Sequence, residues 1–177
     1  MAGKSVSSTT QGHRSYRAAT RLAIAGSDWP RVVKLLTQAV KLGSVEAEYA
    51  LGDLYTRGVY IKKDEPKGAK YWMKASRHGH KTASYNLGVT FEVGVGVPVD
   101  KERAFRYHML ASMQGDDSAP FEIYRMLYHG IGVTRDRELA EAWRQLFERL
   151  EMFTDQAVVR NSASRRAGKR PRRVRGG

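Results

Sequence analysis

The sequence predicts an all-α protein, an α-solenoid of antiparallel helical hairpins with three good 36-residue repeats and a degenerate N-terminal hairpin. Three observations lead to this fold class. Equivalent residues recur every 36 positions in one register, which is the signature of a repeat architecture. Apolar residues return at helical spacing inside each unit. A glycine and then an aspartate follow each first helical segment, and these residues favour a helix end and a helix start.

The register rests on six columns of equivalent residues. They are Asp28, Asp64, Asp100 and Asp136; Gly43, Gly79 and Gly115; Ala47, Ala83 and Ala119; Leu51, Leu87 and Ile123; Tyr55, Phe91 and Leu127; and Gly58, Gly94 and Gly130. Many columns that agree in one register favour a stack of similar hairpins over a single irregular bundle.

Each unit is expected to contain two helices. In the first unit Ala47, Leu51 and Tyr55 share one helical face, and Gly52 beside them lets a neighbouring helix approach closely. Gly58 is placed to end this helix in a left-handed conformation. The aspartate that follows, Asp64, is a favoured N-cap for the second helix.

The pattern sets the expected helices and boundaries. Residues 1–12 are expected to be disordered, 13–155 to form the repeat array, and 156–177 to be a disordered basic tail. Inside the array, helices are expected near 13–25, 29–42, 44–57, 65–78, 80–93, 101–114, 117–129 and 137–153.

The repeat resembles the Sel-one-like repeat, a branch of the tetratricopeptide-like helical repeats. The second unit carries the resemblance through Ala83, Leu87, Gly88, Phe91, Gly94, Gly96, Val97, Asp100, Ala104, Tyr107, Ala111 and Gly115. The first unit departs at Tyr60, and the third departs at Tyr124 and Leu127, which suggests altered packing in the third hairpin. The resemblance covers about 44–150 and implies an adaptor, assembly factor or regulator.

Composition and motifs argue against enzymatic activity. Cysteine is absent, which excludes disulfides, thiolate metal sites and a cysteine nucleophile. The chain shows no histidine pair at metal-ligand spacing and no nucleophile-elbow serine, so we predict no enzyme, no cofactor and no metal site. The chain has no apolar run of the ~20 residues needed to span a bilayer. We expect a cytoplasmic protein, with nuclear or mitochondrial placement as the alternatives if the organism is eukaryotic.

Positive charge is uneven along the chain. The formal net charge is +13, while the middle of the chain, 44–155, is close to neutral. The C-terminal tail holds no acid beyond residue 155, and its candidate contacts to nucleic acid or an acidic partner are Arg165, Arg166, Lys169, Arg170, Arg172, Arg173 and Arg175. Such a tail contacts phosphates by charge alone. An acidic protein, a membrane surface and no specific role remain open alternatives.

The candidate protein-binding groove lies on the first helix of each hairpin, which lines the concave side in tetratricopeptide-like arrays. Its predicted residues are Tyr49, Asp53, Tyr85, Val89, Glu92, Phe121, Arg125 and Tyr128. Aromatic and arginine side chains are typical interface anchors. Packing between repeats is the alternative role for the aromatic column Tyr49, Tyr85 and Phe121.

The sequence thus predicts a non-catalytic adaptor or assembly factor that holds another protein, as a peptide or helix, in this groove. The alternative is a subunit of a nucleic-acid–protein assembly that uses its basic tail.

Overall fold

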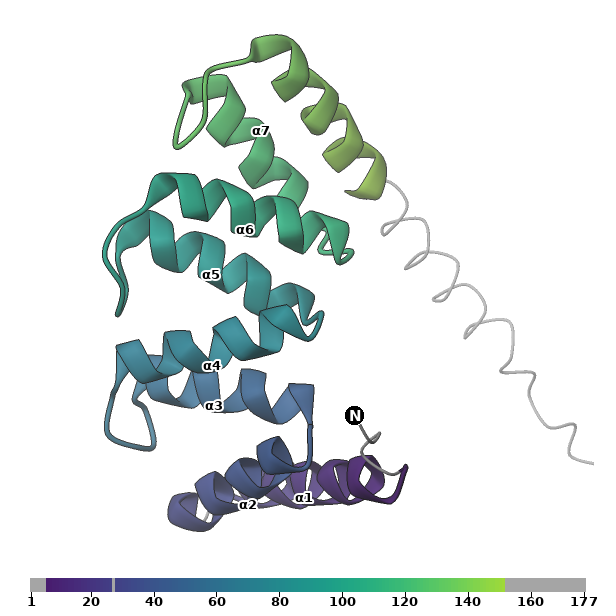
Figure 1. The fold of residues 1–177 in the computed structure, drawn as a ribbon, viewed down its shortest axis with the longest axis vertical. Coiled ribbons are helices and arrows are strands. Elements are labelled where there is room, and N and C mark those ends of the chain that lie inside the picture. The colour runs from purple at the N-terminus through teal and green to yellow at the C-terminus, as the bar shows by residue number, and fades with distance from the viewer. Residues whose placement is uncertain (1–5, 27, 152–177) are drawn as a thin grey trace, which may run out of the picture.

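The computed structural model describes residues 6–26 and 28–151, and all regular secondary structure in this part of the chain is helical. The helices stack as successive hairpins from the N-terminal end to the C-terminal end (Figure 1). They are α1 (Val6–Ile24), α2 (Trp29–Lys41), α3 (Val45–Arg57), α4 (Glu65–Arg77), α5 (Lys81–Val93), α6 (Lys101–Met113), α7 (Ala119–His129) and a final helix over 137–151.

The predicted hairpins are confirmed, with one correction at the N-terminus. Helix α1 begins at Val6, so residues 6–12 are helical although we expected them to be disordered. Gly12 explains part of this extension, because it is buried, and a Cβ added to it would lie 3.1 Å from the Leu42 Cβ. The first turns of α1 therefore pack against the end of α2. The basic tail lies outside the described residues.

The four periodic aspartates are helix N-caps, as predicted. Asp64 Oδ1 accepts a hydrogen bond from the Lys67 amide at 3.0 Å, and Asp100 Oδ1 accepts from the Arg103 amide at 2.9 Å. Asp28 and Asp136 cap the second helices of the outer hairpins in the same way. Each cap satisfies a backbone amide that has no partner inside its helix.

A glycine inside α3 and another inside α5 set the distance between the two helices of their hairpins. A Cβ built on Gly52 of α3 would lie 2.3 Å from Trp72 Cδ1 of α4, and one built on Gly88 of α5 would lie 2.4 Å from His108 Cε1 of α6. The side chains of Trp72 and His108 therefore occupy the space that a Cβ atom at position 52 or 88 would need.

The small and aliphatic columns form the core. Ala47, Leu51, Ala83 and Leu87 have no exposed surface, and Ile123 continues this set in α7. The last hairpin, formed by α7 and the final helix, differs, as expected from Tyr124 in the glycine position. The Tyr124 ring lies beside Phe121 and Tyr128 with ring centroids 5.9 and 5.7 Å away. Within the described residues, no helix combines the length and apolar character needed to cross a membrane.

Candidate binding groove

The first helices of successive hairpins, α3, α5 and α7, are joined by side chains that cross from one to the next. The Tyr49 ring of α3 stacks on His80, the N-cap of α5, with ring centroids 4.3 Å apart. Arg125 of α7 donates to Glu92 of α5 at 2.6 Å. These contacts join the three helices that carry the predicted groove residues, and the groove itself stays a prediction.

The aromatic column contributes to packing between repeats. The Tyr85 ring meets the buried His108 edge-on at 5.4 Å, and its hydroxyl donates a long hydrogen bond of 3.4 Å to Glu122. Burial raises the pKa of the Tyr49 phenol, and burial likewise raises the pKa of the Tyr85 phenol. Phe121 is 42% exposed and touches Phe147 of the final helix. Each ring has a packing contact, and its role in a groove stays a prediction.

Two predicted residues, Glu92 and Arg125, form a polar cluster with Glu122, which the sequence did not single out. Arg125 lies between two carboxylates and also donates to Glu122 through Nε at 2.9 Å. The side chains of Arg125, Glu92 and Glu122 are only 30%, 21% and 18% exposed. The hydrogen bond to Glu92 is the main cause that raises the pKa of the Arg125 guanidinium. This arginine therefore links α5 to α7 and is less available to a partner than the sequence suggested.

Beside that cluster lies His108, which the sequence did not single out. His108 is fully buried, and neither ring nitrogen has a hydrogen-bond partner among the described residues. Burial lowers the pKa of its imidazole. Donor atoms of Glu92, His108 and Glu122 lie within 4.8 Å of one another, a set that could hold a metal ion. A cation there would have to displace the Arg125 guanidinium from both carboxylates. The set has no sequence signature because its members come from three helices.

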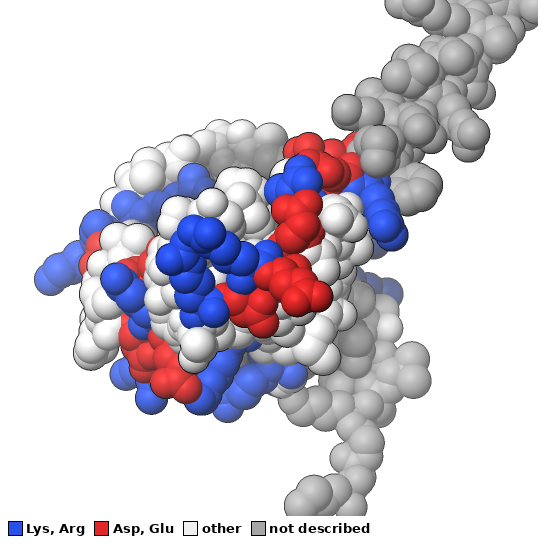
Figure 2. All heavy atoms as spheres, turned by 90° about the horizontal axis from the view of Figure 1, so that it is seen from above, with Lys and Arg blue, Asp and Glu red and all other residues white. Residues whose placement is uncertain are grey.

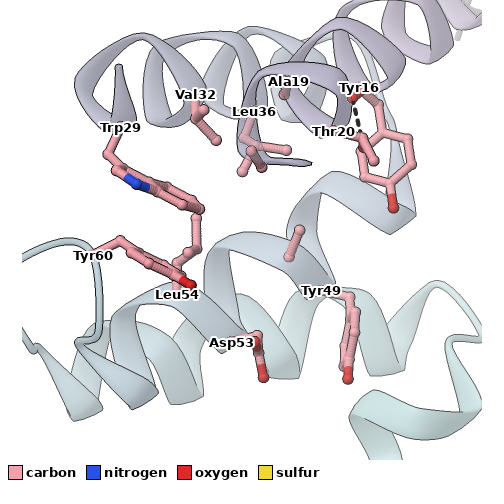
Figure 3. Close-up of a pocket in the computed structure, with 12 residues that line it drawn as sticks. Tyr16, Ala19, Thr20, Trp29, Val32, Leu36, Tyr49, Asp53, Leu54 and Tyr60 are labelled. Carbon is pink, nitrogen blue, oxygen red and sulfur yellow. Dashed lines mark hydrogen bonds between the residues drawn. The ribbon is translucent and has the colours of Figure 1, made fainter. Parts of the chain in front are cut away.

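Tyr49 and Asp53 line an apolar cleft between the first hairpin and α3 (Figure 3). The cleft has a volume of about 340 Å³. Tyr16 and Leu36 line it from the side of the first hairpin, and Leu54 lines it from α3. Asp53 is the acid in its lining, and it accepts a hydrogen bond from Arg57 at 2.7 Å.

Tyr60, which lines the cleft, stands where the repeat has its second loop glycine. In the next unit that glycine is Gly96, whose Cβ position would lie 2.4 Å from the backbone of Glu65 at the start of α4. The equivalent start of the first hairpin's second helix is Trp29. Tyr60 cannot approach this backbone as a glycine does, and its ring stacks on Trp29 at 3.8 Å instead (Figure 3). The paired rings line one end of the cleft.

The remaining predicted residues are more exposed. Val89 is 40% exposed and Tyr128 is 36% exposed, and both lie on first helices. Sequence reasoning missed Tyr16, Trp29 and Tyr60, which come from the degenerate hairpin and from a position that departs from the repeat pattern. The departure at Tyr60 was the one available signal. The tail residues predicted to contact nucleic acid or an acidic partner lie outside the described residues, and that contact stays a prediction.

Comparisons with known proteins agree with this architecture. A protective antigen of uropathogenic Escherichia coli with an SLR fold is 29% identical with a TM-score of 0.73, and the match covers 78% of this chain and 30% of the antigen. A Sel1 repeat protein from Oxalobacter formigenes shares the fold at 22% identity and a TM-score of 0.70, with 78% of this chain and 58% of that protein covered. Helicobacter pylori cysteine rich protein B is 25% identical with a TM-score of 0.55, over 63% of this chain and 85% of that protein.

The match spans less than two thirds of the length of the first two proteins. A search of curated proteins found no match. The family profile described as Sel1 repeat matches residues 45–80, 82–116 and 125–146, which together make up more than half of the sequence. This chain belongs to the Sel1 repeat family.

Proposed function

We propose that this protein is a non-catalytic adaptor that binds a segment of a partner protein along the first-helix face, anchored in the cleft beside Tyr49. Sel1 repeats generally serve as scaffolds for protein interaction. The cleft is the observation that supports a site on this particular chain, because it is apolar, open and continuous with the predicted face.

The lining of the cleft suits an apolar side chain of a partner. Trp29, Tyr60 and Tyr49 provide large rigid ring surfaces that lose little conformational freedom on binding. Binding sites for protein segments commonly place a buried aromatic anchor at their centre and leave polar groups at the rim. Asp53 at the edge of the cleft supplies such a polar group.

Filling the cleft tests this function by adding a side chain to its lining and not by truncating one. Ala50 lines the cleft, and Ala50→Phe places a ring in the space that the partner's anchor would occupy. The matched control is Gln38→Phe, which adds the same ring at an exposed position of α2. Each full-length protein is tagged, and co-purifying proteins are identified and quantified, with circular dichroism to verify the fold.

We expect wild type and Gln38→Phe to recover the same partner in equal amounts. Ala50→Phe is expected to recover at least tenfold less of it. Val89→Asp, on the same face but outside the cleft, is expected to weaken recovery by a smaller factor because it places a charge in the interface. Equal recovery of the partner by Ala50→Phe and by wild type, with both folded, would show that the cleft is not the anchor site.

A further inference from the structure

Positive charge gathers on the second helices of the first three hairpins, although residues 44–155 are close to neutral as a whole. The second helices α2, α4 and α6 carry ten lysines and arginines and two glutamates. The first helices α3, α5 and α7 carry three basic and five acidic residues. Helices α2, α4 and α6 therefore form a strongly basic side of the array. Helices α3, α5 and α7, which hold the candidate groove, are mildly acidic, whereas α1 carries three arginines and no acid.

The basic residues on the second helices follow the repeat. Arg31, Lys67 and Arg103 are spaced by 36 residues, and so are Lys34, Lys70 and Arg106. All six are exposed. We call these two sets the cation columns. Because the hairpins repeat in structure as well as in sequence, equivalent residues lie at the same position on successive second helices. The columns therefore run parallel along one side of the array.

The second helices α4 and α6 border a common hollow. Met73 of α4 lines a space of about 310 Å³ together with Arg103 and Arg106 of α6. The column positions on α6 thus lie at the edge of the same depression that α4 borders. The columns stop at the third unit, where Leu139 and Ala142 occupy the equivalent positions. The basic side is therefore confined to the first three hairpins.

Most of this charge is uncompensated. Among the described residues, Arg103 pairs with Asp100 at 3.1 Å and Arg106 pairs with Glu102, and these are the two column members in ion pairs. Lys67 donates to the neutral Tyr55 hydroxyl at 2.9 Å and keeps its charge. The end of the array contrasts with this side, because Figure 2 shows acidic and basic side chains beside one another there, as in the Arg144–Glu141 pair of the final helix.

We propose that the cation columns bind the phosphate backbone of a nucleic acid. Evenly repeated cations match a polymer whose charges are evenly repeated, and lysine and arginine bind backbone phosphates without reading sequence. A membrane surface fits less well, because α2 and α4 have no exposed large apolar side chain that could insert, and α6 has only Met113 at its end. This site does not depend on the proposed adaptor function, which uses the other helix of each hairpin.

The test compares two full-length variants with equal loss of charge. The column variant is Lys34→Gln, Lys70→Gln and Arg106→Gln. The control variant is Arg14→Gln, Arg17→Gln and Arg21→Gln, which removes three exposed cations from α1. Both carry the same tail and the same net charge, so any effect of the tail is common to the two proteins. Fluorescence anisotropy measures their affinity for a labelled single-stranded RNA, a single-stranded DNA and a DNA duplex over a series of salt concentrations.

We expect the column variant to bind at least one of these probes tenfold more weakly than the control variant at low salt. The slope of log affinity against log salt should fall by about 2 to 3 for the three lost contacts, at ~0.7–0.9 per phosphate contact. Equal affinities and slopes for the two variants would overturn the proposal, because binding would then follow net charge alone. Column-dependent binding to phosphatidylserine vesicles, with unchanged binding to all three nucleic acids, would also overturn it and would identify a membrane surface instead.

Discussion

Gly52→Ala tests whether the contact between Gly52 and Trp72 sets the closure of the second hairpin. The new Cβ would lie 2.3 Å from Trp72 Cδ1 and 2.6 Å from Nε1, whereas ordinary contact begins at 3.4 Å. The indole would have to retreat by about 1.1 Å. Trp72 is only 6% exposed and packs among core residues of α5 and α6, so it has little room to move.

The two energetic effects of this substitution have opposite signs. Alanine is favoured over glycine inside a helix by roughly 1 kcal/mol. Overpacking of a filled core costs typically ~1–3 kcal/mol, and a rigid indole at this distance places the cost near the upper end. We therefore expect Gly52→Ala to lower the free energy of unfolding by about 2 kcal/mol.

Urea denaturation followed by circular dichroism at 222 nm measures this free energy without relying on tryptophan fluorescence. The same substitution in a Trp72→Leu background provides the control, because leucine leaves space for the new methyl group. There Gly52→Ala is expected to be neutral or stabilising. If Gly52→Ala raised the free energy of unfolding of the otherwise wild-type protein, the reasoning would be refuted, since helix propensity would then outweigh any steric conflict.

Three further predictions address capping, protonation and the ion cluster. Asp100→Ala should cost about 1 kcal/mol of unfolding free energy by urea denaturation, whereas Ser118→Ala, whose side chain makes no capping bond, should change it by less than ~0.5 kcal/mol. Burial lowers the pKa of His108, so the unfolded chain binds a proton that the folded chain excludes as the pH falls below about 6.5. The loss of stability between about pH 6.5 and 5 should therefore be smaller in His108→Phe, and an unchanged pH slope would contradict this. Arg125→Met leaves two partly buried carboxylates without their cation. It should lower the free energy of unfolding by about 2 kcal/mol, between the values for exposed and buried ion pairs. A loss below ~0.5 kcal/mol would show that the cluster does not stabilise the fold.

Local features of the repeat could be predicted from the sequence because they depend on near neighbours. Asp64 and Asp100 are N-caps since a short carboxylate before a helix satisfies the amide three residues on. Gly58 ends α3 with a φ of 64°, in the left-handed region that glycine adopts without strain. The start of α1 was missed, because the contact of Gly12 with Leu42 joins residues that are distant in the sequence.

The sequence by itself determined the repeat, its helices and its caps, because a 36-residue period repeats the same local chemistry in every unit. The tertiary structure decided the features on which function depends. Tyr60 stacks on Trp29 and lines the cleft beside Tyr49, at a position where the next units place a glycine. Arg125 is partly buried and joins α5 to α7, whereas the lysines and the arginine of α4 are exposed. These distinctions follow from which side of each helix faces the core, and that is settled only when the hairpins stack.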